Sequence, residues 1–166
     1  MTVLMTFLPK EQGMRTPPWL FAFARTLTSV EFKLDAFASV EDALCTNYYD
    51  VAANGLVQPW LDATFANPPF NLMAKVVDKA LTEAADRHHT SVLIGLAGCS
   101  QQWFHRLIKF AGTTVYFPDR RLQFLQPDGT PTRNAMADAA VYRLHGRQRR
   151  RGGVDVQTFH VPGGLK

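Results

Sequence analysis

The chain has 166 residues, of which 46% are hydrophobic and 19% charged, so we expect one compact globular domain and not a disordered chain. No apolar run approaches the roughly 20 residues that span a bilayer, the N-terminus lacks the pattern of a signal peptide, and two distant cysteines do not suggest a disulfide scaffold. These exclusions favour a protein of the reducing cytoplasm, with a net charge of +4 whose distribution is uneven.

In the first half of the chain, the pattern predicts two helices and two short strands. Residues 16–27 read as a helix, because Thr16 can cap it and the two prolines that follow suit a first helical turn. A strand is expected to end near Asp35, and residues 63–66 form a second strand that stops at prolines. Residues 71–87 carry apolar side chains at helical spacing and give the clearest helix.

In the second half, a continuous apolar run at residues 91–97 predicts a buried parallel strand, followed by a helix that Gly112 ends. Three further strands are expected, at residues 113–118, 121–126 and 135–144. Strands and helices thus alternate before paired strands close the domain. This order predicts an α/β fold whose sheet is mainly parallel with an antiparallel edge.

The basic character lies at the end of the chain. Residues 143–166 contain six Lys/Arg and one Asp/Glu residue, whereas residues 1–142 are nearly neutral. We therefore divide the chain into a single domain at residues 1–144 and a basic, flexible tail at residues 145–166. Such a tail suits a nucleic-acid contact, although a solvated tail that only aids solubility would have the same composition.

The stretch "ANPPF" at residues 66–70 places a polar side chain and an aromatic ring around two prolines. Each proline fixes its own φ and favours an extended conformation at the residue before it, so Asn67 and Pro68 have little freedom. The Asn67 side chain and the Pro68 backbone offer two neighbouring acceptor oxygens, which suit the two N–H bonds of an exocyclic amine. Phe70 offers a face on which a base could stack. The alternative is a rigid corner with Phe70 in the core.

This stretch resembles the (Asp/Asn/Ser)-Pro-Pro-(Tyr/Phe/Trp) motif of the amino-group DNA methyltransferases, which modify adenine N6 or cytosine N4. The stretches "RTPPWLF", "LDAFAS", "CTNYYD", "ANPPFN", "QQWFH" and "DRRLQFL…AVYRL" also follow in the order typical of small phage-type DNA N-6-adenine methyltransferases. The resemblance runs from about Arg15 to Leu144. It implies a Rossmann-like methyltransferase sheet with helices on both faces.

The resemblance also implies S-adenosylmethionine as cofactor and assigns residues to it. The catalytic motif corresponds to Asn67, Pro68, Pro69 and Phe70. The cofactor-binding positions correspond to Thr16 and Pro17, to a loop of Asp35, Ala36, Phe37, Ala38 and Ser39, and to Asp50. Asp35 would hold the cofactor's amino group, and Asp50 its ribose hydroxyls. The loop has no glycine, and the motif has Asn where many relatives have Asp.

The implied partner is double-stranded DNA in the cytoplasm of a bacterial host, with the protein encoded by a phage or prophage, and no metal or membrane is required. The side chains expected to contact DNA are Arg120, Arg121, Arg133, Arg147, Arg149, Arg150 and Arg151. Two other functions remain open at this point. One is a catalytically silent nucleic-acid-binding protein on the same fold, and the other is methylation of cytosine N4.

Overall fold

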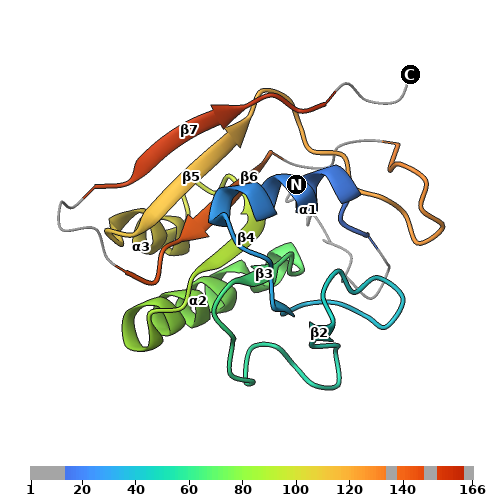
Figure 1. The fold of residues 1–166 in the computed structure, drawn as a ribbon. Helices are drawn as coiled ribbons and strands as arrows, with labels where there is room; N and C mark the ends of the chain where they lie inside the picture. The colour runs from blue at the N-terminus through green and yellow to red at the C-terminus, as the bar shows by residue number, and fades with distance from the viewer. Residues whose placement is uncertain (1–13, 134–137, 148–152, 163–166) are drawn as a thin grey trace, which may run out of the picture.

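A computed structural model describes residues 14–133, 138–147 and 153–162. The elements in chain order are α1 (Pro18–Thr28), β1 (Leu34–Asp35), β2 (Asn47–Tyr48), β3 (Thr64–Ala66), the 3-10 turn η2 (Phe70–Leu72), α2 (Met73–Arg87), β4 (Ser91–Leu96), α3 (Gln102–Lys109), β5 (Thr113–Pro118), β6 (Ala139–Leu144) and β7 (Asp155–Phe159). The strands form one sheet in the order β2-β1-β3-β4-β6-β5-β7 (Figure 1).

The strand directions confirm the expected α/β sheet. The pairs β1/β2, β1/β3, β3/β4 and β5/β7 are parallel, and β6 runs antiparallel to both of its neighbours. The antiparallel strand is therefore internal, because β7 adds in parallel beside β5 and forms the edge. All strands except β6 consequently end at the same side of the sheet.

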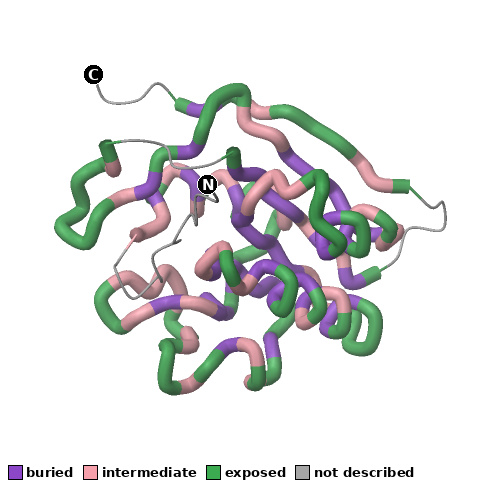
Figure 2. Tube along the Cα trace, turned by 180° about the vertical axis from the view of Figure 1, so that it is seen from behind, coloured by how far each residue is buried: buried purple, intermediate pink, exposed green. Residues whose placement is uncertain are grey.

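Two apolar clusters fill the space between the sheet and its helices. Along β4, Val92 and Ile94 belong to the cluster that also contains buried residues of α1, whereas Leu93 belongs to the cluster that contains α2 and α3. This alternation is what a strand buried on both faces requires. Figure 2 shows the buried residues gathered at the centre of the molecule. With α1 on one face of the sheet and α2 and α3 on the other, the domain has three layers.

Helix α1 begins as its prolines predict but without the expected side-chain cap. Pro17 is extended (φ −60°, ψ 140°), and Pro18 is the first helical residue, where a missing N–H costs nothing. The expectation that Thr16 caps the helix is wrong, since the cap position is Pro17. The Thr16 hydroxyl is used elsewhere, as described below.

Two further expectations are corrected. Residues 121–126 do not form a strand of the sheet, and in the described part of that segment only Leu125 makes bridges, to Arg15 and Pro131. The division after residue 144 is wrong as well, because Asp155–Phe159 form β7 and pair with β5. The pairing depends on partners distant in sequence, which the local composition of the tail does not reveal.

Glu83 is the most deeply buried carboxylate of α2, with 3% exposure. Its Oε1 accepts the Trp60 backbone N–H at 3.2 Å and lies 2.8 Å from Lys79 Nζ. Burial alone would raise the pKa of Glu83, but the hydrogen bond from Lys79 and that from Trp60 outweigh it and hold the pKa below 4.5. The carboxylate therefore ties α2 to the chain that leads into β3.

We expect Glu83→Gln to lower the free energy of unfolding by about 1–3 kcal/mol at pH 7, because a buried charge-assisted contact is lost. Since the folded pKa is lowered, this contribution is complete above the unfolded pKa of about 4.3. It disappears as the pH falls through the lower folded value. Urea unfolding at pH 7 and pH 3 measures the difference. Glu31→Gln, at an exposed ion pair with Arg25, is the control and should change little at either pH.

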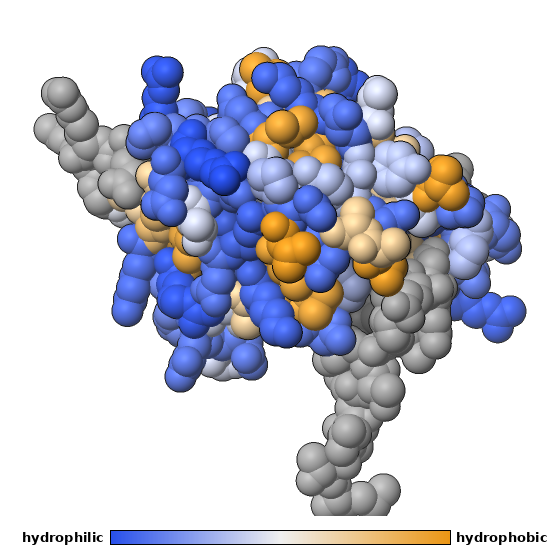
Figure 3. Space-filling view, turned by 90° about the horizontal axis from the view of Figure 1, so that it is seen from below, coloured by the Kyte–Doolittle hydropathy of each residue, from blue (hydrophilic) through white to orange (hydrophobic). Residues whose placement is uncertain are grey.

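The face seen from below in Figure 1 is covered mostly by hydrophilic side chains, with apolar ones in separate groups (Figure 3). The large exposed apolar side chains of the described residues include Val51 and Val57. Scattered apolar residues of this kind are normal on a protein surface. No helix within the described ranges is long and apolar enough to cross a membrane.

Candidate active site

The candidate site begins where β3 ends and residues 67–70 lead the chain into η2 and α2. The carboxyl ends of β1 and β3 lie side by side, because Asp35 pairs with Phe65 and the Ala36 N–H donates to the Phe65 carbonyl at 2.9 Å. From β1 the chain continues to β2 on one side, and from β3 to β4 on the other. Ligands of open α/β sheets bind where the strand order reverses in this way.

The two prolines hold this corner in an extended form before the 3-10 turn. Pro69 has φ −52° and ψ 131°, and its carbonyl accepts the Leu72 N–H at 2.9 Å. The carbonyl of the buried Pro68 accepts no hydrogen bond from the described part of the chain. The sequence predicted that the Pro68 carbonyl is an available acceptor, and no donor from the described residues occupies it.

Asn67 is 6% exposed, and its amide nitrogen donates to Thr16 Oγ1 at 2.8 Å. Within the described residues, no donor bonds to its Oδ1. The amide therefore presents its nitrogen to the chain before α1 and keeps its oxygen available. Thr16 and Asn67, 51 residues apart, form one unit.

Phe70 is half-buried, and its ring meets that of Phe124 edge-on, with 6.1 Å between centroids and an angle of 73°. It belongs to the cluster on the α1 side of the sheet. Both readings of this residue have support, since the ring packs on the core yet remains partly accessible.

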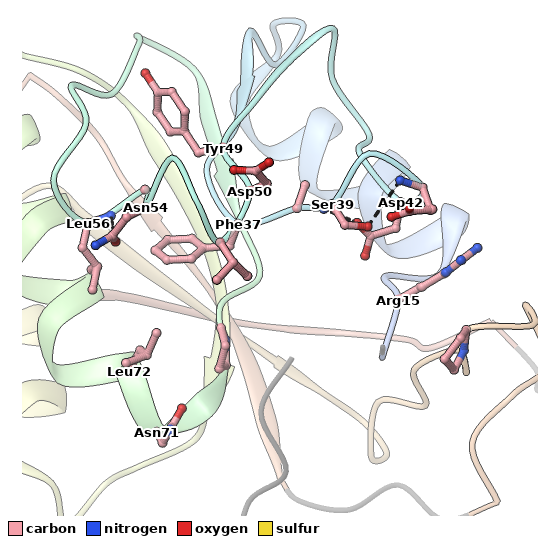
Figure 4. A pocket seen from close by; sticks show the side chains of 16 residues that line it. Arg15, Phe37, Ser39, Asp42, Tyr49, Asp50, Asn54, Leu56, Asn71 and Leu72 are labelled. Atoms are coloured by element: carbon pink, nitrogen blue, oxygen red, sulfur yellow. Dashed lines mark hydrogen bonds between the residues drawn. The ribbon is translucent and has the colours of Figure 1, made fainter. Parts of the chain in front are cut away.

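A cavity of about 690 Å³ opens beside the corner. Its lining residues, shown in Figure 4, are Arg15, Phe37, Ala38, Ser39, Glu41, Asp42, Tyr49, Asp50, Val51, Asn54, Gly55, Leu56, Pro69, Asn71, Leu72 and Pro127. Ligand pockets for small molecules and cofactors usually measure about 300–1,000 Å³. The cavity therefore has the size of a cofactor site.

The structure brings together only part of the predicted cofactor set. Phe37, Ala38, Ser39 and Asp50 line the cavity, and so does Pro69 of the catalytic motif. The lining does not include Thr16, Pro17, Asp35 or Ala36, nor the motif residues Asn67, Pro68 and Phe70. These residues stand at the neighbouring ends of β1 and β3 and before α1.

Asp35 acts on the shape of the cavity loop. It is 3% exposed, and its carboxylate accepts the backbone N–H of Phe37 at 3.4 Å and that of Leu44 at 3.3 Å. These contacts fold residues 35–44 back on the end of β1. The contact of Asp35 with the cofactor's amino group, which the resemblance implies, stays a prediction.

The carboxylates that do line the cavity come from the loops after β1 and β2. Asp50 accepts the Ala53 N–H at 2.8 Å, and Asp42 accepts the Ser39 N–H at 2.5 Å. A hydrogen bond from the Ser39 side chain holds the pKa of Glu41 below 4.5. With three carboxylates and the single guanidinium of Arg15, the cavity favours a ligand that carries positive charge.

Sequence reasoning missed several lining residues. They are Arg15, Glu41, Asp42, Tyr49, Val51, Asn54, Gly55, Leu56, Asn71, Leu72 and Pro127. Arg15 and Tyr49 belong to the stretches "RTPPWLF" and "CTNYYD". A further signal was the Asn54-Gly55 turn, which is present, with Asn54 at φ 59°. Gly55 fits here because a Cβ on it would stand 2.0 Å from the Ala36 carbonyl oxygen. The turn therefore packs directly on the end of β1 and closes one wall of the cavity.

Among the residues that the structure describes, the arginines predicted to contact DNA lie at opposite ends of the strands. Arg120 and Arg121 follow the carboxyl end of β5, the same side as Asn67, and are 52% and 60% exposed. Arg133 is exposed at the end of the loop that follows them.

Arg147 follows the antiparallel β6, and the neighbouring Gly146 bonds to His88 at the end of α2. In Figure 1 the end of β6 and the start of β7 lie at the left, and the loop after β5 extends to the right. Arg149, Arg150 and Arg151 lie outside the described residues.

The mainly parallel sheet, with an Asn-Pro-Pro-Phe corner beside a ligand cavity, is consistent with the Rossmann-like fold class of methyltransferases. The sequence matches the family "DNA N-6-adenine-methyltransferase (Dam)" over residues 6–151. The chain belongs to this family.

A curated relative is the "DNA N-6-adenine-methyltransferase" of Haemophilus phage HP1 (strain HP1c1), which is 25% identical over 111 residues. The aligned region covers 66% of this chain and 64% of the relative, so the chain spans just under two thirds of that protein's length.

Proposed function

We propose that the protein transfers a methyl group from S-adenosylmethionine to the N6 amine of adenine in double-stranded DNA, within the cytoplasm of a phage-infected or prophage-carrying bacterium. One observation carries the proposal. Two adjacent acceptors, Asn67 Oδ1 and the Pro68 carbonyl, are left without a donor from the described residues, beside a cavity with an acidic wall. Buried acceptors are usually paired with protein or ordered water, so two adjacent ones without a protein donor offer a place where a ligand can supply the donors.

The cavity fits S-adenosylmethionine in size and in charge. Asp50 can accept hydrogen bonds from the ribose hydroxyls, and Phe37 and Leu56 offer apolar surface to the cofactor's base. The acidic loop at Glu41 and Asp42 suits the cationic groups of the methionine end. When bound, S-adenosylmethionine would supply a methyl group on a positively charged sulfur: the carbon–sulfur bond would break as the nitrogen–carbon bond forms, the sulfur would leave as a neutral thioether, and the amine would release its proton to water.

The residues of the corner would act by position. An adenine inside a duplex cannot reach the site, so the base must leave the helix, and Phe70 provides a partly exposed ring on which it can rest. Asn67 Oδ1 and the Pro68 carbonyl oxygen would each accept a hydrogen bond from one N–H of the amine. These two hydrogen bonds would direct the nitrogen lone pair away from both oxygens. Holding the amine in this orientation is the main catalytic device, and it requires no strong acid or base.

The proposal is tested by sequencing modified bases in DNA from cells that express the protein. We expect methylated adenines in a recurring sequence context. Methylation at cytosine N4 would overturn the choice of base. Unmodified DNA, together with calorimetric binding of DNA but not of S-adenosylmethionine, would favour the catalytically silent nucleic-acid-binding protein.

We further propose that Arg120, Arg121 and Arg133 contact DNA phosphates. The double variant Arg120→Gln, Arg121→Gln should weaken DNA binding and reduce the slope of log affinity against log salt by about 2, since each phosphate contact releases counterions. Arg87→Gln is the matched control, because Arg87 is also 52% exposed and paired with a carboxylate. It ends α2, ahead of β4 and thus at the opposite ends of the strands, so we expect its slope to equal that of the wild type. An unchanged slope in the double variant would exclude this surface.

The role of the tail in DNA binding should be tested by removing its charged side chains and not by deleting its residues. Removing residues 146–166 would also remove β7 and the buried Val161, whose N–H donates to Asp119 at 3.0 Å. Loss of DNA binding in such a truncation would therefore report damage to the sheet. Replacing Arg149, Arg150 and Arg151 with glutamine separates the charge of the tail from its structural part.

A further inference from the structure

We infer that Arg15 binds the carboxylate at the methionine end of the cofactor, so that the cavity selects a ligand with a complete amino-acid group. The inference rests on the proposed function and adds a specificity-determining residue to it. The resemblance assigns Arg15 no contact with the cofactor, yet the structure places this residue in the lining of the cavity, one position before Thr16.

The charges of the lining create the need for such a residue. Glu41, Asp42 and Asp50 contribute three carboxylates, and Arg15 is the only cationic side chain among the lining residues that the structure describes. The ammonium group and the positively charged sulfur of S-adenosylmethionine suit these carboxylates, but the carboxylate of the cofactor would be repelled by them. Arg15 is therefore the part of the lining that can stabilise this carboxylate.

Arg15 lies at the acidic end of the cavity. In Figure 4 it is on the side of Ser39 and Asp42, whereas Leu56 is at the other end. The hydrogen bond from Ser39 is the main reason that the pKa of Glu41 is lowered, and the positive charge of Arg15 adds to this effect. Carboxylates and a guanidinium thus stand at one end of the cavity, which matches the ammonium and carboxylate groups that an amino acid carries on a single carbon.

The guanidinium of Arg15 is available to a ligand. The side chain is half-buried, and within the described part of the chain it makes no hydrogen bond or ion pair. The backbone of Arg15 is held by two hydrogen bonds with Leu125, at 2.7 and 3.0 Å. A guanidinium presents its N–H groups as a planar fork, which fits the two oxygens of a carboxylate.

A DNA phosphate is the other anion to consider, because Pro127, in the loop between Arg121 and Arg133, lines the same cavity. A phosphate that approached Arg15 would also approach Glu41 and Asp42 and would be repelled by them. The carboxylate of an amino acid differs, since the ammonium group beside it compensates the charge of these residues. The surroundings of Arg15 therefore favour the cofactor.

The first test compares two ligands on the wild-type protein without DNA. Decarboxylated S-adenosylmethionine keeps the sulfonium and the amine but lacks the carboxylate, and it carries one more net positive charge. An acidic cavity without a carboxylate contact would bind it more tightly. We expect the opposite order by calorimetry, with a Kd for S-adenosylmethionine at least tenfold lower than that for the decarboxylated ligand. Equal affinity, or tighter binding of the decarboxylated ligand, would overturn the inference.

The second test repeats both titrations on variants. Arg15→Gln should raise the Kd for S-adenosylmethionine by about 10- to 100-fold and change that for the decarboxylated ligand by less than about threefold. Arg15→Lys keeps the charge but not the fork, so we expect a smaller rise of about 3- to 10-fold. Arg25→Gln is the control, because Arg25 pairs with Glu31 on the surface and does not line the cavity. Its affinities should equal those of the wild type.

The outcomes separate the inference from the proposed function. Equal losses for the two ligands in Arg15→Gln would show general damage to the cavity and reject the contact. An unchanged Kd for S-adenosylmethionine, together with a DNA salt slope reduced by about 1, would assign Arg15 to a phosphate instead. If the wild type methylates adenine but does not distinguish the two ligands, the proposed function stands and the role of Arg15 is rejected. If the wild type binds neither ligand, both fail. The comparison on the wild type decides alone if Arg15→Gln does not fold.

Discussion

Replacing Asn67 with alanine is expected to lower kcat for adenine methylation by about 10²–10³-fold while the protein remains folded. The variant loses the acceptor that meets the amine as positive charge develops on its nitrogen, and loss of one such preorganised group costs about that factor. The cost in stability should be small, about 1 kcal/mol, because the only side-chain hydrogen bond removed is the one to Thr16. Binding of S-adenosylmethionine should change little, since Asn67 does not line the cavity.

Single-turnover methylation of DNA, with cofactor affinity measured by calorimetry, checks this expectation. Asn47→Ala is a matched control, because Asn47 also makes one side-chain hydrogen bond, to the Lys33 carbonyl at 3.0 Å, at a position away from the cavity. We expect the control to methylate at nearly the wild-type rate. A wild-type rate in Asn67→Ala would refute the role of the corner. Loss of both methylation and folding would show that Asn67 is mainly structural.

Much of the central fold can be predicted from local pattern. The apolar run that forms β4 and the helical spacing in α2 are strong signals, and the prolines at residues 68–69 mark where β3 ends. These features can be predicted without knowledge of distant contacts, because burial on both faces and helical amphipathicity follow from the pattern of residues that are neighbours in sequence. The motif at the corner could be located for the same reason.

The parts that escaped prediction depend on distant contacts. The tail strand β7 has only five residues, and it is held by pairing with β5 and by the contact of Val161 with Asp119. The bond between Thr16 and Asn67 joins segments 51 residues apart. A local pattern contains no record of either. The turn at Asn54 and Gly55 was recognised from the sequence, but its contact with the end of β1, which makes it a wall of the cavity, was not.

The second large effect is expected at Gly55. A Cβ there would stand 2.0 Å from the Ala36 carbonyl oxygen, a distance that real Cβ atoms do not adopt, and both partners are backbone. Neither can move aside cheaply, since the Gly55 carbonyl accepts the Trp60 indole N–H at 2.8 Å and the Ala36 N–H is bonded to Phe65. Gly55→Ala should therefore displace the turn that lines the cavity, and we expect the Kd for S-adenosylmethionine to rise at least tenfold, about 1.4 kcal/mol.

Calorimetry of cofactor binding and thermal unfolding measure the two consequences. The control is Gly95→Ala in β4, where a Cβ would meet the flexible end of the Met73 side chain, with Cε at 2.3 Å and Sδ at 2.6 Å. Methionine can change rotamer, so that variant should keep its cofactor affinity even if its melting temperature falls. Wild-type affinity in Gly55→Ala would mean that the cofactor does not use this wall. Equal losses of affinity in the two variants would mean that general destabilisation, and not the shape of the cavity, limits binding. In Gly55→Ala the new Cβ meets backbone, whereas in Gly95→Ala it meets a flexible side chain. Comparing the two variants therefore distinguishes an effect on the cavity wall from an effect on the core.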